Sequence, residues 1–285
     1  MNSTQRTIKY CAMAFAILLA VGIISGMASI LFAVINVISG NSKEFRIGFS
    51  KNGTYNSSDY DNKFTGVKSL KIDNSIGTLK ICIGDEFRVE ANNVSKRFKA
   101  EVDESGRLSV TDQGDGLFWF NIGGITHPNS KIIVYVPSDF AAKEVLISTG
   151  AGSTSIEGIN TDYLYIDGGA GSISGTDIVA RKVKLNGGVG STIFNNVNFG
   201  ESEFDCGVGK FEVSGKLLGE TDVDGGVGEV TLDIAGEEED YGYNADTGLG
   251  PIKWNSDKIS GKNNSQAENL INVDGGVGPI YINFQ

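Results

Sequence analysis

The sequence predicts an all-β protein: a single-stranded, β-helix-like β-solenoid with turns of about 19 residues, preceded by one N-terminal transmembrane helix. The first observation behind this prediction is composition, since 39 of the 285 residues are glycine and only four are proline. This is roughly twice the usual ~7 % of glycine. The second is a glycine motif that recurs at a fixed interval, and the third is an alternation of apolar and polar residues around that motif. Alternating segments joined by glycine turns are typical of short strands.

The charge is acidic and unevenly distributed. The whole chain carries a net charge of −11, and residues 1–40 contain Arg6, Lys9 and no acidic residue. The remaining residues therefore carry 22 basic and 35 acidic side chains, a net −13. Such a surface repels polyphosphate, so nucleic acid is not expected as a partner.

Residues 1–9 are expected to form a cytoplasmic tail and residues 10–39 a transmembrane anchor. No charged residue occurs from position 10 to position 39, and this run exceeds the ~20 residues that cross a bilayer. A secretory signal cleaved at Ala28 is the alternative, although apolar residues continue beyond that point and signal cores span only about 7 to 15 residues. The small residues Gly22 and Gly26 fit either ordinary membrane composition or a contact with another membrane helix.

The location of the domain follows from the form of this N-terminus. Arg6 and Lys9 before the apolar run and Lys43 and Arg46 after it nearly balance, so they do not fix the orientation of the helix. A short tail followed by a long, strand-rich, cysteine-poor domain is similar to bacterial signal-anchor proteins. We therefore expect a single-pass protein of the cell membrane with an extracytoplasmic C-terminal domain.

Residues 40–64 are polar and are expected to form a spacer. Residues 65–137 contain short alternating segments separated by turn residues, and they predict an irregular first section of the solenoid. The aromatic cluster at residues 118–120 is interpreted as a cap on the core, with an exposed, adhesive tip as the alternative.

Residues 138–285 contain the regular repeats. The last glycine of each "GGVG"-like motif serves as the reference, and a degenerate eighth copy lies in the first section. The intervals between successive reference glycines are equal from Gly152 to Gly228, and the two later intervals are longer and are interpreted as turns with loop insertions. The structural turn glycines are Gly77, Gly152, Gly171, Gly190, Gly209, Gly228, Gly250 and Gly278.

The columns beside these glycines have one chemical character each. Apolar residues occur five positions before the glycine and two and four positions after it, so successive units stacked together form one continuous core. A short polar residue precedes the turn. The expected structural turn residues are Asp73, Asp167, Asn186, Asp205, Asp224, Asp246 and Asp274.

The glycine motif invites three functional interpretations. A dinucleotide-binding loop requires a helix after the glycines, whereas "EVTLDI" and "PIYINF" are strand patterns. A calcium-binding nonapeptide solenoid requires aspartate where this chain has Phe211 or Val230. The aspartates before the glycines favour hydrogen bonding to turn amides over metal binding. We therefore expect no cofactor and no metal residue.

Cysteine and histidine offer little chemistry. Cys82 and Cys206 lie far apart in strand-like runs and are expected to be buried free thiols. His127 is the only histidine, and Arg181 is the only arginine of the regular repeats. No catalytic residue is assigned, and a β-helix carbohydrate-active enzyme stays only as the least favoured interpretation.

A family resemblance is carried by the order of four segments: "LKIDNSIGTLKICIGDEFRVEA", "GRLSV", "SKIIVYVPSDFAAKEVLISTGAGSTSI" and the copies of "DGGAGSIS". This arrangement resembles the bacterial putative-adhesin domain family, over roughly residues 67–285. The resemblance implies a strand-repeat envelope protein and supplies no catalytic residue.

The expected function is non-catalytic: adhesion, binding or structural display at the bacterial cell envelope, with a protein, a cell-wall component or a carbohydrate as the ligand. The alternative is an accessory or regulatory membrane protein of a cell-envelope stress response, acting through its anchor. The sequence does not predict an oligomeric state.

Overall fold

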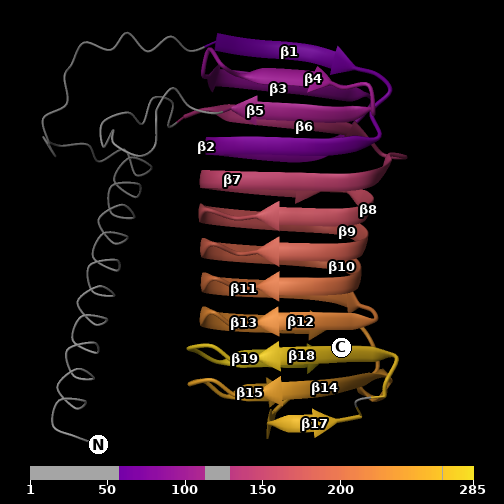
Figure 1. Ribbon diagram of the computed structural model, residues 1–285, viewed down its shortest axis with the longest axis vertical. Coiled ribbons are helices and arrows are strands. Elements are labelled where there is room, and N and C mark those ends of the chain that lie inside the picture. The colour runs from indigo at the N-terminus through magenta and orange to yellow at the C-terminus, as the bar shows by residue number, and fades with distance from the viewer. Residues whose placement is uncertain (1–57, 113–128, 265) are drawn as a thin grey trace, which may run out of the picture. The chain divides into compact units, whose positions relative to one another are not determined.

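Parallel strands from successive repeats lie side by side and build one continuous stack (Figure 1). The computed structural model describes residues 58–112, 129–264 and 266–285. Within these ranges the chain forms nineteen strands and one short 3-10 helix, η1 (Glu238–Asp240). The prediction of an all-β fold is confirmed for this part of the chain, and the parallel stacking is solenoid-like.

The regular turns occupy the centre of the stack. Their strands are β7 (Ala141–Glu157), β8 (Asn160–Asp167), β9 (Ala170–Asn186), β10 (Val189–Asp205), β11 (Val208–Leu217), β12 (Glu220–Asp224) and β13 (Val227–Ile234). Residues one repeat apart pair in register, as Gly171 does with Gly190 and Leu185 with Phe204. Each side chain therefore lies above its equivalent in the neighbouring turn.

Because of this register, the apolar columns stack into a continuous core. Alternate side chains point inward, so the buried residues of one turn stack on those of the next. Phe194, Phe199, Phe204 and Phe211 are all buried, and their ring centroids are 6.2, 6.5 and 5.5 Å apart in that order. The short third segment of each unit also contributes, since Ile178 is fully buried.

A second corner lies after the first buried segment of each turn. Asp177 and Asn196 adopt φ of 56° and 52° there, a conformation that aspartate and asparagine tolerate better than most residues. The Asn196 side-chain amide donates to Asp177 Oδ1 at 2.5 Å. These two residues are also one repeat apart, so this second corner recurs in the sequence at the same interval as the glycines.

The N-terminal end does not follow the chain order. Its strands are β1 (Ser58–Phe64), β2 (Ser69–Gly84), β3 (Phe87–Val94), β4 (Lys99–Val102), β5 (Arg107–Asp112) and β6 (Lys131–Pro137). Strand β2 pairs in parallel with β7 on one side and with β5 and β6 on the other. Strands β1, β3 and β4 pair antiparallel and close this end of the stack.

Strand β1 corrects the expectation that residues 40–64 are a spacer throughout. Its residues form an antiparallel pair with β3. Most of its side chains are exposed, so the segment lacks the apolar alternation that predicts a strand. Backbone hydrogen bonding, a few polar contacts and the partly buried rings of Tyr60 and Phe64 hold it in place.

The C-terminal end corrects the expected stacking order. Its strands are β14 (Tyr241–Asp246), β15 (Ile252–Trp254), β16 (Asp257–Ile259), β17 (Gly261–Asn263), β18 (Asn269–Asp274) and β19 (Ile280–Phe284). The last pair, β18 and β19, lies between the turn of β12 and β13 and the turn of β14 and β15 (Figure 1). The prediction that the copy at Gly250 follows the copy at Gly228 is therefore wrong.

The reason for this order is visible in the partners of the strands. Strand β17 pairs antiparallel with β14, and β16 pairs antiparallel with β15. These short strands cover the outer side of the β14–β15 turn, as β1, β3 and β4 do at the other end. The final turn then fills the inner position, so the long interval between repeats is a cap rather than a loop insertion.

The predicted anchor, residues 10–39, and the aromatic cluster at residues 118–120 lie outside the described residues. Among the residues that are described, none belongs to a helix with the length and apolar character that a membrane crossing requires.

Candidate functional site

The turn glycines lie above one another at a single corner. Pairing and nearest neighbours give the order Gly77, Gly152, Gly171, Gly190, Gly209, Gly228, Gly278 and Gly250. All but Gly250 have φ between 107° and 143°, which residues with a Cβ rarely adopt. A Cβ atom on Gly209 would also overlap the carbonyl oxygen of Gly190. The glycines therefore allow both the bend and the close approach of neighbouring turns.

The short polar residues before the glycines form a parallel column. The order along the stack is Asp73, Ser148, Asp167, Asn186, Asp205, Asp224, Asp274 and Asp246. Asp205 and Asp224 each accept a hydrogen bond from the backbone N–H two residues later, at 3.1 and 3.3 Å. Asn186 instead donates to Asp167 Oδ1 at 3.3 Å.

An exposed aliphatic row accompanies the last four carboxylates. In each of these turns the residue three positions after the aspartate is large and apolar. We call this row, Val208, Val227, Val277 and Leu249, the corner ridge. Their exposed fractions are 44, 48, 48 and 87 %. Backbone pairing places Val208 beside Val227 and Val227 beside Val277, and Leu249 N–H donates to Gly276 O at 2.9 Å.

The basic side chains of the neighbouring outer face form ion pairs with other acidic residues. Lys182 pairs with Glu201, Lys184 pairs with Glu203 at 2.5 Å, and Arg181 contacts Asp162 at 3.2 Å. The hydrogen bond that Lys184 donates to Glu203 raises the pKa of Lys184. Among the described residues, no lysine or arginine forms an ion pair with the four ridge aspartates, which are Asp205, Asp224, Asp274 and Asp246.

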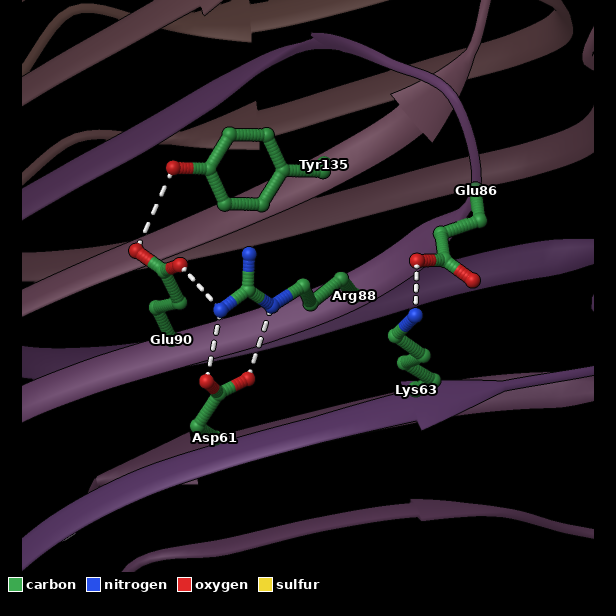
Figure 2. A network of polar contacts seen from close by, with 6 residues as sticks. All are labelled: Asp61, Lys63, Glu86, Arg88, Glu90 and Tyr135. Carbon is green, nitrogen blue, oxygen red and sulfur yellow. Dashed lines mark hydrogen bonds and ion pairs between the residues drawn. The ribbon is translucent and has the colours of Figure 1, made fainter.

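A second polar cluster lies on the antiparallel end, where Arg88 of β3 connects three strands (Figure 2). Its Nε and one terminal nitrogen donate to the two carboxylate oxygens of Asp61 at 2.8 and 2.6 Å. The same terminal nitrogen lies 2.7 Å from Glu90 Oε1. Tyr135 donates from its hydroxyl to Glu90 Oε2 at 3.2 Å, and its ring lies 5.9 Å from the guanidinium carbon. Lys63 and Glu86 form a separate pair at 2.5 Å.

The ionisation states in this cluster follow from these contacts. The hydrogen bond from Arg88 lowers the pKa of Asp61, and the same bond raises the pKa of Arg88. Partial burial, followed by the charge of Glu90, raises the pKa of Tyr135. Asp61 and Arg88 are therefore both charged at neutral pH, and the tyrosine is protonated.

This cluster connects strands and offers little reactive chemistry. Both of its carboxylates already contact the guanidinium, and the hollows beside Asp61 are shallow and open. Within residues 58–112, 129–264 and 266–285, no three acidic, histidine or cysteine side chains gather as a metal site would require. His127 lies outside the described residues.

Cys82 and Cys206 are buried free thiols, as expected. Burial raises the pKa of both, and the charges of Asp205 and Asp224 contribute at Cys206. Thiols with a raised pKa are poor nucleophiles at neutral pH. The two cysteines therefore act as small apolar residues of the core.

The family model of the Toastrack DUF4097 domain matches residues 67–273. The chain belongs to this family. Its Toastrack domain begins just before β2 and extends into β18. The resemblance to a putative-adhesin domain family that the sequence suggested is thereby confirmed. No curated protein matches the chain.

Three solved structures match the chain at low identity. A putative cell adhesion protein from Clostridium sporogenes is 18 % identical, with 81 % of this chain and 100 % of that chain covered and a TM-score of 0.40. A putative adhesin from Bacteroides fragilis is 14 % identical, with 80 and 98 % covered and a TM-score of 0.42. A putative lipid binding protein from Parabacteroides distasonis is 16 % identical, with 81 and 98 % covered and a TM-score of 0.45. At such TM-scores none of these proteins indicates what this chain binds.

Proposed function

We propose that this Toastrack protein is a membrane-anchored, extracytoplasmic β-solenoid that binds or displays ligands at the bacterial cell envelope without catalysis. The observation that carries the proposal is the in-register stack of turns, which fixes rows of equivalent side chains along one surface. Stacked repeats commonly provide such extended binding surfaces. The apolar run at residues 10–39 supplies the proposed anchor.

The rigidity of the surface supports a role in display. At the glycine corner, the backbone N–H groups of Val208, Val227 and Val277 each donate to a carbonyl of the neighbouring turn at 2.8 Å. A corner held by repeated backbone hydrogen bonds presents its side chains in one geometry, so binding orders little additional structure.

The proposed location is tested with the full chain in intact bacterial cells. Lys262 is exposed on β17, and Lys262→Cys should react with a membrane-impermeant maleimide, in a background where Cys11 is serine. Cys82 and Cys206 are buried and should not react before the cells are lysed in denaturant. Ser3→Cys, in the expected cytoplasmic tail, is the matched control and should stay unlabelled. Labelling of Ser3→Cys but not of Lys262→Cys would contradict the proposed orientation.

Two variants distinguish display by the solenoid from a role of the anchor, one that lacks the solenoid and one in which the anchor is replaced. Removal of residues 65–285 should abolish the phenotype of the full chain, whereas replacement of residues 10–39 by an unrelated membrane helix should preserve it. The opposite pattern would favour the accessory role in a stress response.

A further inference from the structure

The corner ridge and the ridge aspartates form one composite surface. Each of the last four turns contributes one carboxylate and, three residues later, one exposed aliphatic side chain. The pairs are Asp205 with Val208, Asp224 with Val227, Asp274 with Val277, and Asp246 with Leu249. Three earlier turns differ at one or both positions, with Ser148 and Ala151, Asp167 and Ala170, and Asn186 and Val189. The first turn has the same residue types, Asp73 and Ile76, but Ile76 is only partly exposed, as are Ala151, Ala170 and Val189. The combination is thus confined to one end of the stack.

The carboxylates of this surface repel one another. Asp205 pairs with Asp224, Asp224 with Asp274, and Asp274 with Asp246, so four negative charges lie in adjacent turns. Like charges directly opposite each other destabilise a sheet. No lysine or arginine among the described residues forms an ion pair with them, and Lys182 and Lys184 of the preceding turn pair with Glu201 and Glu203. A positively charged partner would relieve this repulsion.

The apolar row adds a second requirement. A row of exposed aliphatic side chains beside charged residues is typical of a contact surface. Its ideal partner carries an apolar stripe next to a cationic stripe. Two copies of this chain would bring two acidic rows together, and an anionic lipid surface would be repelled in the same way.

The spacing of the rows favours one shape of partner. Stacked strands lie ~4.8 Å apart, so the four turns span roughly 14 Å. An α-helix advances about 5.4 Å per turn, and ten residues of helix cover about 15 Å. An extended peptide along the same line would repeat its side chains every ~6.7 Å, out of step with the turns.

We infer that the corner ridge and its aspartates dock a cationic amphipathic α-helix of another molecule, lying along the stack. Its aliphatic side chains contact Val208, Val227, Val277 and Leu249, and its lysine or arginine side chains contact the four aspartates. This inference rests on the proposed binding function and names the chemistry of the partner.

The test measures the binding of a labelled peptide of leucine and lysine, about 14 residues long and patterned for an amphipathic helix. The full chain is held in phosphatidylcholine nanodiscs, and empty nanodiscs give the background. Fluorescence anisotropy should show saturable binding that weakens as salt is added, because added ions screen exposed charges. A peptide with glutamate in place of lysine should not bind.

Two double variants locate the site. Asp224→Asn with Asp274→Asn should weaken binding about fivefold, since two exposed ion pairs are lost. Asparagine fits this column, because Asn186 already occupies it. Val227→Thr with Val277→Thr should weaken binding to a similar degree, because apolar contact area is lost. Threonine is β-branched like valine, so the strands should be preserved. Asp73→Asn with Asp167→Asn removes the same charge from the same column outside the ridge, so it is the matched control and should bind as the parent does.

Each remaining result would overturn the inference. Absence of binding above the background, or equal losses in the ridge and control variants, would show that the ridge does not dock such a helix. Equal binding of the lysine and glutamate peptides would indicate an apolar contact only. Oxidation of Leu249→Cys to a disulfide dimer at a rate that the lysine peptide does not lower would assign the ridge to a second copy of the chain. The maleimide experiment uses no peptide, so these failures are distinguishable from failure of the proposed location.

Discussion

The corner glycines set the distance between neighbouring turns. At Gly209 the backbone has φ of 133°, and any Cβ atom would overlap a carbonyl oxygen of the turn next to it. Relief of that overlap requires the two turns to separate at the corner. The hydrogen bonds of the corner would lengthen with them.

Replacement of Gly209 by alanine should therefore destabilise the domain by about 2–4 kcal/mol, through backbone strain together with loss of packing. The measurement is the urea midpoint of the full chain, followed by far-ultraviolet circular dichroism. Gly219→Ala is the control, because Gly219 has φ of 72° and no atom within 4 Å of an added Cβ. A smaller loss for Gly209→Ala than for Gly219→Ala would argue against close approach at the corner.

At the scale of elements, β1 combines polar contacts with two partly buried rings, Tyr60 and Phe64, that pack against the core. Two hydrogen bonds from Arg88 to Asp61 connect it to β3. Because the pKa of Asp61 is lowered below its ordinary value of 3.8, the pair contributes stability in full well above pH 3.8. That contribution is lost as the pH falls below this value, through the folded-state pKa of Asp61.

Asp61→Asn should accordingly speed hydrogen exchange of the β1 amides at pH 7, with β9 and β10 unchanged. Exchange is followed by mass spectrometry on the full chain. Asp162→Asn serves as control because Arg181 is 80 % exposed, against 36 % for Arg88, and makes one hydrogen bond to Asp162 where Arg88 makes two to Asp61. Such exposed, single-bonded pairs stabilise little. Unchanged exchange in β1 would mean that the strand is held without the Asp61 contact.

The sequence predicted which residues are buried, but it did not predict the order of the last turns. The spacing of the glycines and the apolar columns predicted the buried positions of Phe194, Phe204 and Phe211, because inward residues recur at fixed intervals in a stacked turn. The same pattern could not rank the copies at Gly228, Gly250 and Gly278. Their corner sequences are nearly equivalent, so each fits beside either of the others.

The polar cluster around Arg88 could be predicted only in part. The alternation in "FRVEA" places Arg88 and Glu90 on one face, which the sequence alone shows. Their contact with Asp61 depends on the antiparallel pairing of β1 with β3. A polar edge strand has no apolar period, so neither the strand nor its partner could be predicted.

On the scale of the whole domain, both ends of the stack are closed by the same device. At each end, antiparallel strands cover an outer turn, which is formed by β5 and β6 at one end and by β14 and β15 at the other. The order of construction differs, because the inner strand β2 precedes its outer turn in the chain, whereas the inner strands β18 and β19 follow theirs. Terminal turns of a repeat protein need such covering, because an open turn exposes unpaired backbone groups. The closed ends leave the sides of the stack, including the corner ridge, as the surfaces available for binding.

The stacking order is in register, with the final turn inserted before the turn of β14 and β15. Its most direct test is a pair of double cysteine variants of the full chain, oxidised under native conditions and examined by peptide mass spectrometry. Val227→Cys with Val277→Cys should form a disulfide, because these residues are adjacent in the stack and neighbouring strands lie within disulfide reach. Val227→Cys with Leu249→Cys should not, since Val277 lies between them. A disulfide in the second variant and none in the first would show sequential stacking and contradict the account.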